Sequence, residues 1–190
     1  MMSLLSLAPE CNNPDFATVE ITGLSADSRA VAPGYLYAAL PGTKTDGALF
    51  VDDAKKNGAI ALLAKPEHEG LARDAALAFV GDDNPRRALA YMAARYYPKQ
   101  PDHIAAVTGT NGKTSVAGFL AQIWQQLGLT AASMGTLGVR GRDFAIDLGH
   151  TTADPVAVHK ALDMVAERGA THLALEASSH GLDQYRLDGV

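Results

Sequence analysis

A glycine-rich segment in the second half of the chain has the residue types and the spacing of a phosphate-binding loop. It consists of Gly109, Thr110, Asn111, Gly112, Lys113, Thr114 and Ser115. Glycines let successive backbone N–H groups point at one anion, and the N-terminus of a following helix adds partial positive charge. Lys113 would reach the outer phosphates of a nucleotide, and the Thr114 hydroxyl would contact its Mg²⁺ ion. We therefore predict that this loop binds a nucleoside triphosphate.

The match to the general pattern of such loops fails at one position. That pattern has a glycine five residues before Gly112, where this chain has Val107. The alternative is an ordinary strand-to-helix turn in which Gly109 and Gly112 only supply unusual backbone angles. Such a turn does not need a lysine directly after its second glycine, so Lys113 favours the phosphate site.

The segments around the loop predict a mostly parallel α/β sheet with helices on its faces. A short apolar strand at 104–108 leads into the loop, and the helix after it ends at Gly128. The apolar side chains on one face of that helix are Val116, Phe119, Leu120, Ile123 and Leu127. Further elements are predicted at 130–139 (strand), 144–148 (strand), 154–169 (helix) and 171–175 (strand). Ligands of such sheets bind at the carboxyl ends of the strands, where this loop lies.

The first half of the chain is predicted to form a separate, smaller α/β domain. Its elements are strands at 35–40, 59–64 and 76–80 and helices at 51–57 and 85–96. Two prolines and several polar residues at 97–102 interrupt the helical pattern. We therefore place the domain boundary after residue 98, which gives domains 1–98 and 99–190.

The composition excludes several classes of partner and site. The 190 residues carry a net charge of −5 without a basic run, so we expect no nucleic-acid surface. Cys11 is the only cysteine, which excludes an internal disulfide and a cysteine-based zinc site and fits a reducing compartment. The sequence contains no secretion signal and no apolar stretch of membrane-spanning length. We expect a cytoplasmic protein without a membrane partner, and a monomer.

The chain resembles the Mur ligase family along nearly its whole length. In the second domain the resemblance is carried by residues 108–115, by Thr151-Thr152 and by residues 176–186. In the first domain it is carried by Asp27-Ser28-Arg29, Pro33-Gly34, Gly42, Asp46-Gly47 and Gly58-Ala59. These segments are similar to the branch of the family that extends the UDP-N-acetylmuramoyl dipeptide. Without the other segments, Asp27-Ser28-Arg29 would be interpreted as a capped turn.

The resemblance implies an α/β fold and an amide-forming ligase. A small N-terminal domain would bind the UDP-muramoyl substrate, and the first part of a P-loop domain with a mostly parallel sheet would bind ATP and Mg²⁺. ATP would phosphorylate the D-glutamate carboxylate of UDP-N-acetylmuramoyl-L-alanyl-D-glutamate, because a free carboxylate is a poor electrophile. The amine of the third amino acid, meso-diaminopimelate or L-lysine, would then displace phosphate from the acyl phosphate in peptidoglycan synthesis.

The resemblance also implies the residues of the metal and ATP site. Residues 109–115 would hold ATP, Thr114 and Glu176 would hold Mg²⁺, and Lys113 and Glu176 would be the catalytic residues. Glu176 suits this role independently, because an unpaired carboxylate at the end of a buried strand is costly without a cation. The alternative for Glu176 is a surface glutamate at a strand end.

The substrate-binding residues implied by the resemblance fall into two groups. The group in the first domain is Ala26, Ser28, Thr43, Lys44 and Thr45, and the group in the second is His150, Thr151, Thr152, Ser178, Gln184 and Arg186. The segment at 43–45 departs from a His-Gln-Ala version found in some members, and His150 stands where asparagine is expected. The planar guanidinium of Arg186 suits a bidentate contact to a carboxylate or phosphate.

Asp83-Asn84-Pro85-Arg86 spells a motif with which some family members recognise diaminopimelate, but its position argues against that role. The recognising motif belongs to the family's C-terminal domain, whereas this copy lies at the end of the first. An Asp or Asn cap followed by a proline in the first turn of a helix explains it.

Family members continue well beyond the length of this chain. The lysine that they carbamoylate to position a second Mg²⁺ and the domain that binds the amino acid have no counterpart here. We therefore expect no ligase activity from the 190 residues alone. The alternatives are a relative of the folylpolyglutamate synthases, a non-catalytic nucleotide-binding module and a P-loop kinase. The first-domain segments argue against the first of these, and the absence of an evident base argues against the last.

Overall fold

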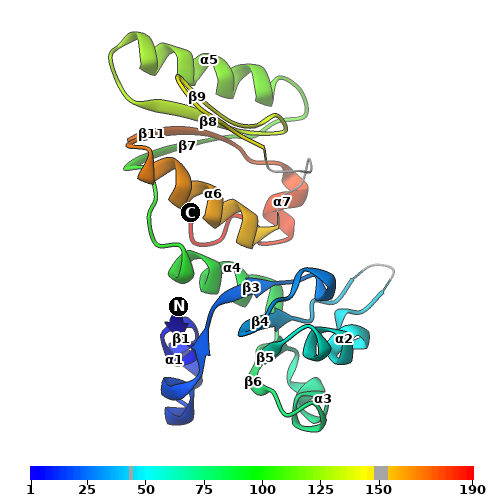
Figure 1. Cartoon of the computed structure of the whole chain (residues 1–190). Coiled ribbons are helices and arrows are strands. Elements are labelled where there is room, and N and C mark those ends of the chain that lie inside the picture. Colours follow the sequence, from blue (N-terminus) through cyan, green and yellow to red (C-terminus); the bar gives the residue numbers. More distant parts are fainter. Residues whose placement is uncertain (43–44, 148–153) are drawn as a thin grey trace. The chain divides into compact units, whose positions relative to one another are not determined.

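A computed structural model describes residues 1–42, 45–147 and 154–190 of the chain. The chain forms two compact units, Met1–Tyr96 and Tyr97–Val190. Each unit is an α/β structure with its own sheet (Figure 1). The predicted α/β class is confirmed; the sheet of the first unit is fully parallel, and that of the second is mixed.

The first unit is built on a four-stranded, fully parallel sheet. In spatial order its strands are β3 (Gly23–Ser25), β4 (Tyr35–Ala38), β5 (Ala59–Ala64) and β6 (Ala78–Gly81). The helices of the unit are α1 (Leu4–Leu7), α2 (Val51–Lys56), α3 (Glu69–Asp74) and α4 (Pro85–Tyr96). A separate antiparallel pair joins β1 (Met2–Ser3) to β2 (Glu20–Ile21). The elements predicted between residues 35 and 96 are therefore present, whereas α3 and the elements before residue 35 (β1, α1, β2 and β3) were not predicted.

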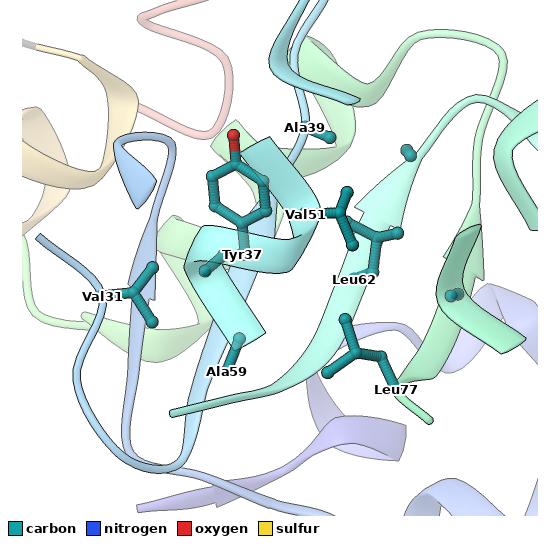
Figure 2. Packing of buried hydrophobic residues seen from close by; sticks show 10 residues of the cluster. Val31, Tyr37, Ala39, Val51, Ala59, Leu62 and Leu77 are labelled. Carbon is teal, nitrogen blue, oxygen red and sulfur yellow. The ribbon is translucent and has the colours of Figure 1, made fainter. Parts of the chain in front are cut away.

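Tyr37 lies at the centre of the first unit's core. It packs with Val31, Val51, Leu62 and other buried apolar side chains (Figure 2). Its hydroxyl donates a hydrogen bond of 2.9 Å to the carbonyl oxygen of Gly47. Burial raises the pKa of Tyr37 to about 12, so the phenol stays protonated and remains a donor. The hydrogen bond fixes the segment that follows β4 to the core.

Asn84 caps α4, as the sequence predicts. Its side-chain oxygen accepts a hydrogen bond of 3.2 Å from the backbone N–H of Arg87, and Pro85 is the first residue of the helix. The Arg86 side chain donates to the carbonyl oxygen of Pro41. The Asp83-Asn84-Pro85-Arg86 segment therefore makes the contacts of a helix start.

The second unit contains a five-stranded mixed sheet. In spatial order its strands are β10 (Ala145–Ile146), β9 (Gly138–Gly141), β8 (Ala131–Gly135), β11 (His172–Glu176) and β7 (His103–Val107). Strands β8, β11 and β7 are parallel, while β9 and β10 run antiparallel to their neighbours. The helices are α5 (Lys113–Gln126), α6 (Pro155–Glu167) and α7 (Ser179–Asp183). In Figure 1, α5 and α6 cover opposite faces of this sheet.

Two predictions for this unit are wrong. The segment 130–139 is not one strand, because the chain turns back after Gly135 and continues as β9 from Gly138, whose φ of 77° favours glycine. The face predicted to be the apolar side of α5 is not its buried face either. Only Ala117 and Ala121 of α5 are buried, whereas four of the predicted side chains are largely exposed: Val116 51%, Phe119 62%, Ile123 52% and Leu127 71%.

Among the described residues, no helix has the length and apolar character that crossing a lipid bilayer requires.

Candidate functional site

The glycine-rich loop connects the end of β7 to the start of α5. Gly109 and Gly112 have φ values of 140° and 81°, which L side chains rarely adopt, so both positions need glycine. Gly112 precedes the first residue of α5 and provides no side-chain cap, so no side chain competes for the first N–H groups of the helix. The loop residues are exposed apart from Lys113, which is half-buried. This arrangement presents a helix N-terminus to an anion.

The ammonium group of Lys113 lies over the loop. Its Nζ donates to the carbonyl oxygen of Gly109 at 2.7 Å and to that of Thr110 at 3.4 Å. The charge is therefore held against the carbonyl oxygens of the loop rather than extended into solvent. Phosphate oxygens at this position would replace neutral carbonyls with charged acceptors, which form the stronger hydrogen bonds.

Thr114 and Glu176 meet at the carboxyl end of the sheet. Strand β11 pairs in register with β7, so that Glu176 lies opposite Val107, directly before the loop. The Thr114 hydroxyl donates to Oε2 of Glu176 at 3.0 Å. The backbone N–H of Thr136 donates to Oε1 at 3.2 Å. The structure therefore brings together two residues predicted as metal ligands, 62 positions apart in the sequence.

The oxygen atoms of Thr114 and Glu176 fit a small hard cation. Mg²⁺ binds hydroxyl and carboxylate oxygens at about 2.0–2.1 Å in octahedral geometry, which puts adjacent ligand oxygens about 3 Å apart. The separation of Thr114 Oγ1 and Glu176 Oε2 is 3.0 Å. Mg²⁺ usually takes one or two protein oxygens together with phosphate oxygens, and this pair lies beside the loop that would hold the phosphates.

A cavity of about 300 Å³ opens next to this pair, between α5 and the β8–β9 hairpin. Its lining residues include Thr114, Gly118, Gln122, Ser133, Arg140 and Glu176. Arg140, Gln122 and the turn at Thr136 were not predicted from the sequence. Thr136 contributes through its backbone N–H, so its side-chain type gives no signal. Gly135 could have indicated this turn, because a glycine within a strand often marks the close approach of another group.

The predicted substrate residues that follow β11 lie around α7. Ser178 caps this short helix, and its Oγ accepts from the backbone N–H of Gly181 at 3.0 Å. The side-chain oxygen of Gln184 accepts from Nη2 of Arg186 at 2.6 Å, which orients the guanidinium. Because Ser178 is two residues after Glu176, α7 begins close to this predicted metal ligand. His150, Thr151 and Thr152 lie outside the described residues.

Three of the predicted substrate residues of the first unit line a second cavity, of about 540 Å³. Ala26, Ser28 and Thr45 are among its lining residues, together with Arg29 and Tyr37. Thr43 and Lys44 lie outside the described residues. The cavity is therefore formed by two segments that the sequence resemblance associates with one ligand.

Asp27 and Arg29 form a capped turn at the edge of this second cavity. The Asp27 carboxylate accepts from the Arg29 guanidinium at 2.9 and 2.7 Å and from the Arg29 backbone N–H at 3.0 Å. The hydrogen bonds from Arg29 lower the pKa of Asp27. The capped turn considered as an alternative for this segment therefore exists, and it shapes one wall of the cavity.

Two protein-family models match this chain. A model described as "Mur ligase family, catalytic domain" matches residues 20–97, and one described as "Mur ligase middle domain" matches residues 107–190. Together they cover both units of the structure.

Curated relatives and solved structures agree with these matches. The UDP-N-acetylmuramoyl-L-alanyl-D-glutamate–2,6-diaminopimelate ligase of Bradyrhizobium diazoefficiens is 52% identical over 177 residues, which are 93% of this chain and 36% of that protein. The protein of the same name from Caulobacter vibrioides is 49% identical over 185 residues, covering 94% and 37%. A solved structure with this name is 32% identical and covers all of this chain and 38% of its own, with a TM-score of 0.84. The MurF structure from Acinetobacter baumannii, at 21% identity and a TM-score of 0.60, shares the fold. The chain thus spans about 36% of the length of its curated relatives.

Proposed function

The chain belongs to the Mur ligase family, and we propose that it forms the UDP-substrate and ATP-binding part of a ligase that adds the third amino acid to UDP-N-acetylmuramoyl-L-alanyl-D-glutamate. The names of its relatives support 2,6-diaminopimelate as that amino acid. The observation that carries the proposal is the contact of Thr114 with Glu176 beside a loop with Lys113 above it. An ordinary strand-to-helix turn requires neither the lysine over the loop nor the contact between the hydroxyl and the carboxylate.

The loop and Lys113 would bind the outer phosphates of ATP. The N–H groups at the start of α5 and the Lys113 ammonium donate to phosphate oxygens and stabilise the negative charge there. Thr114 and Glu176 would hold Mg²⁺, which neutralises charge on the phosphate oxygens when it is bound. The chain thereby orients the γ-phosphoryl group for in-line attack.

The proposed reaction balances in two steps. An oxygen of the D-glutamate side-chain carboxylate attacks the γ-phosphorus of ATP, the bond to the β–γ bridging oxygen breaks, and ADP leaves. The amine of diaminopimelate then attacks the acyl carbon, phosphate leaves, and the nitrogen loses a proton to give the amide. Arg186, oriented by Gln184, would contact the substrate's carboxylate near this centre.

The cavity of the first unit would receive the UDP end of the substrate. Ser28 lines this cavity and is 7% exposed, so a ligand there would meet a largely buried serine. The charged pair of Asp27 and Arg29 borders the same cavity and provides donors at its rim. The full reaction would belong to the whole protein, because this chain matches only 36% of its relative's length.

Calorimetric titration of the 190-residue chain tests the proposal. One titration uses Mg-ATP and a separate one uses UDP-N-acetylmuramoyl-L-alanyl-D-glutamate. Binding of both ligands is expected. Binding of ATP alone would instead support a nucleotide-binding module of another function, and failure to bind either ligand would contradict the proposal for this chain.

A further inference from the structure

Strand β8 ends in a glycine that its backbone conformation does not require. Gly135 does not have the positive φ of Gly109, Gly112 or Gly138. Glycine weakens a strand and, within one, often marks the close approach of another group. A Cβ atom at Gly135 would lie less than 3.0 Å from three atoms of Glu176, Cγ, Cδ and Oε1. The space beside Gly135 is therefore taken by the Glu176 side chain.

The turn after β8 also fixes the orientation of the Glu176 carboxylate. The backbone N–H of Thr136 donates to Oε1 at 3.2 Å, and the Thr114 hydroxyl donates to Oε2 at 3.0 Å. The two donors come from different elements, the β8–β9 turn and the start of α5. A glutamate side chain otherwise has several rotamers, and holding it in one removes an entropy cost from ligand binding.

We propose that Gly135 and Thr136 are positioning residues of the Mg²⁺–nucleotide site. Gly135 leaves room for the Glu176 side chain, and the Thr136 N–H holds Oε1, so that Oε2 faces Thr114 and the phosphate loop. This inference rests on the proposed function, in which Glu176 is a metal ligand. Gly135 and Thr136 themselves act only through Glu176.

A methyl group at Gly135 would displace the carboxylate without disturbing the fold. The atoms that it would meet belong to the end of one flexible side chain, and no backbone atom is among the nearest three. The backbone of residue 135 has a conformation open to L residues. The Gly135→Ala chain is therefore expected to fold normally and to lose the alignment of Glu176 with Thr114.

The test compares the affinity for ATP measured with Mg²⁺ and with EDTA, in the full 190-residue chain. In the unsubstituted chain Mg²⁺ is expected to raise this affinity. Gly135→Ala should reduce the gain from Mg²⁺ about 10- to 100-fold, the usual effect of removing an outer support of a metal ligand. Its affinity in EDTA and its unfolding midpoint should stay unchanged. Gly70→Ala, an exposed glycine with open space around it, is the matched control and should keep the full gain.

A double-mutant cycle with Glu176→Gln distinguishes an effect of Gly135→Ala through Glu176 from a loss of affinity that is independent of Glu176. If Gly135 acts through Glu176, adding Gly135→Ala to Glu176→Gln should cause no further loss. An unchanged Mg²⁺ gain in Gly135→Ala, or additive losses in the double variant, would overturn the inference. The inference would also be overturned if Gly135→Ala weakened ATP binding in EDTA as much as in Mg²⁺ and lowered the unfolding midpoint. Absence of any Mg²⁺ gain in the unsubstituted chain would instead refute the proposed function, before any variant is compared.

Discussion

The imidazole of His159 meets the backbone carbonyl oxygen of Asp188 at 3.0 Å. His159 is fully buried on α6, and a carbonyl only accepts, so Nε2 donates and carries the proton. Its Nδ1 has no hydrogen-bond partner among the described residues. Protonation would place a charge on this unpartnered nitrogen, and burial accordingly lowers the pKa of His159, more than the Asp188 carbonyl raises it.

We predict that the second unit loses stability as the pH falls below about 6.5, the ordinary histidine value. In the unfolded chain His159 takes up a proton near that pH, whereas the folded state resists it until the pH reaches its lowered pKa. The unfolded state therefore binds more protons in this window, and the free energy of unfolding rises with pH across it. Urea unfolding between about pH 5 and pH 8 measures the effect. His159→Gln should flatten the dependence, and the exposed His180→Gln should leave it in place; equal profiles for His159→Gln and the unsubstituted chain would contradict the prediction.

Lys113→Ala is predicted to abolish measurable ATP binding. The ammonium is the one loop side chain placed over the carbonyls of Gly109 and Thr110, where outer phosphates would lie. Calorimetric titration with Mg-ATP measures the loss. Lys160→Ala removes an exposed lysine from α6 and serves as the control for net charge. An unchanged affinity in Lys113→Ala would remove the phosphate role from this loop.

Ser28→Ala is predicted to weaken binding of the UDP substrate about 5- to 10-fold, the usual value of one hydrogen bond to a neutral group. The substitution removes only a hydroxyl from the cavity wall. The affinity for Mg-ATP should not change, because the loop belongs to the other unit. Parallel titrations of the same sample with both ligands distinguish a local effect from misfolding. A loss of both affinities would show that the serine supports the fold instead.

The composition led us to expect a monomer, but the exposed apolar side chains on α5 now predict weak, concentration-dependent self-association of the 190-residue chain. Phe119 and Ile123 are 62% and 52% exposed, and contiguous apolar patches of this kind are interaction sites or liabilities for aggregation. The double substitution of Phe119 and Ile123 by Gln should give a monomer in sedimentation equilibrium with unchanged unfolding. Ala121→Gln, on the buried face of the same helix, should destabilise the chain. Monomeric behaviour of the unsubstituted chain at all concentrations would contradict the association.

Local sequence patterns predicted those parts of the site that lie within a few residues of one another. The glycines, Lys113 and Thr114 form one unbroken segment, and their spacing alone indicates a strand, a turn and a helix start. Glu176 followed from its place at the end of an apolar strand and from the family resemblance. Its pairing with Thr114 depends on the register of β11 with β7, which places the two residues at one edge of the sheet.

The predictions for residues 130–139 and for α5 failed because tertiary contacts, rather than residue types, determine these features. The run from 130 to 139 mixes five apolar residues with three hydroxyl residues and two glycines, and it contains no proline, asparagine or aspartate. Its pattern therefore does not show that the chain reverses between Gly135 and Gly138. On α5, large apolar side chains predict the buried face, but the small residues Ala117 and Ala121 lie against the sheet. Helix–sheet packing at close range needs small side chains, and hydrophobicity alone does not identify them.

Successive side chains of a strand point to opposite faces of the sheet, so the position of Glu176 within β11 determines the face on which it lies. Along β11, Leu173 and Leu175 belong to the core that contains α6 residues, while Glu176 contacts Thr114 of α5 on the opposite face. A single-residue deletion inside this five-residue strand would exchange the two faces. The carboxylate would enter the apolar layer and a leucine would face Thr114. Only an insertion or deletion of an even number of residues would keep Glu176 on the side of Thr114.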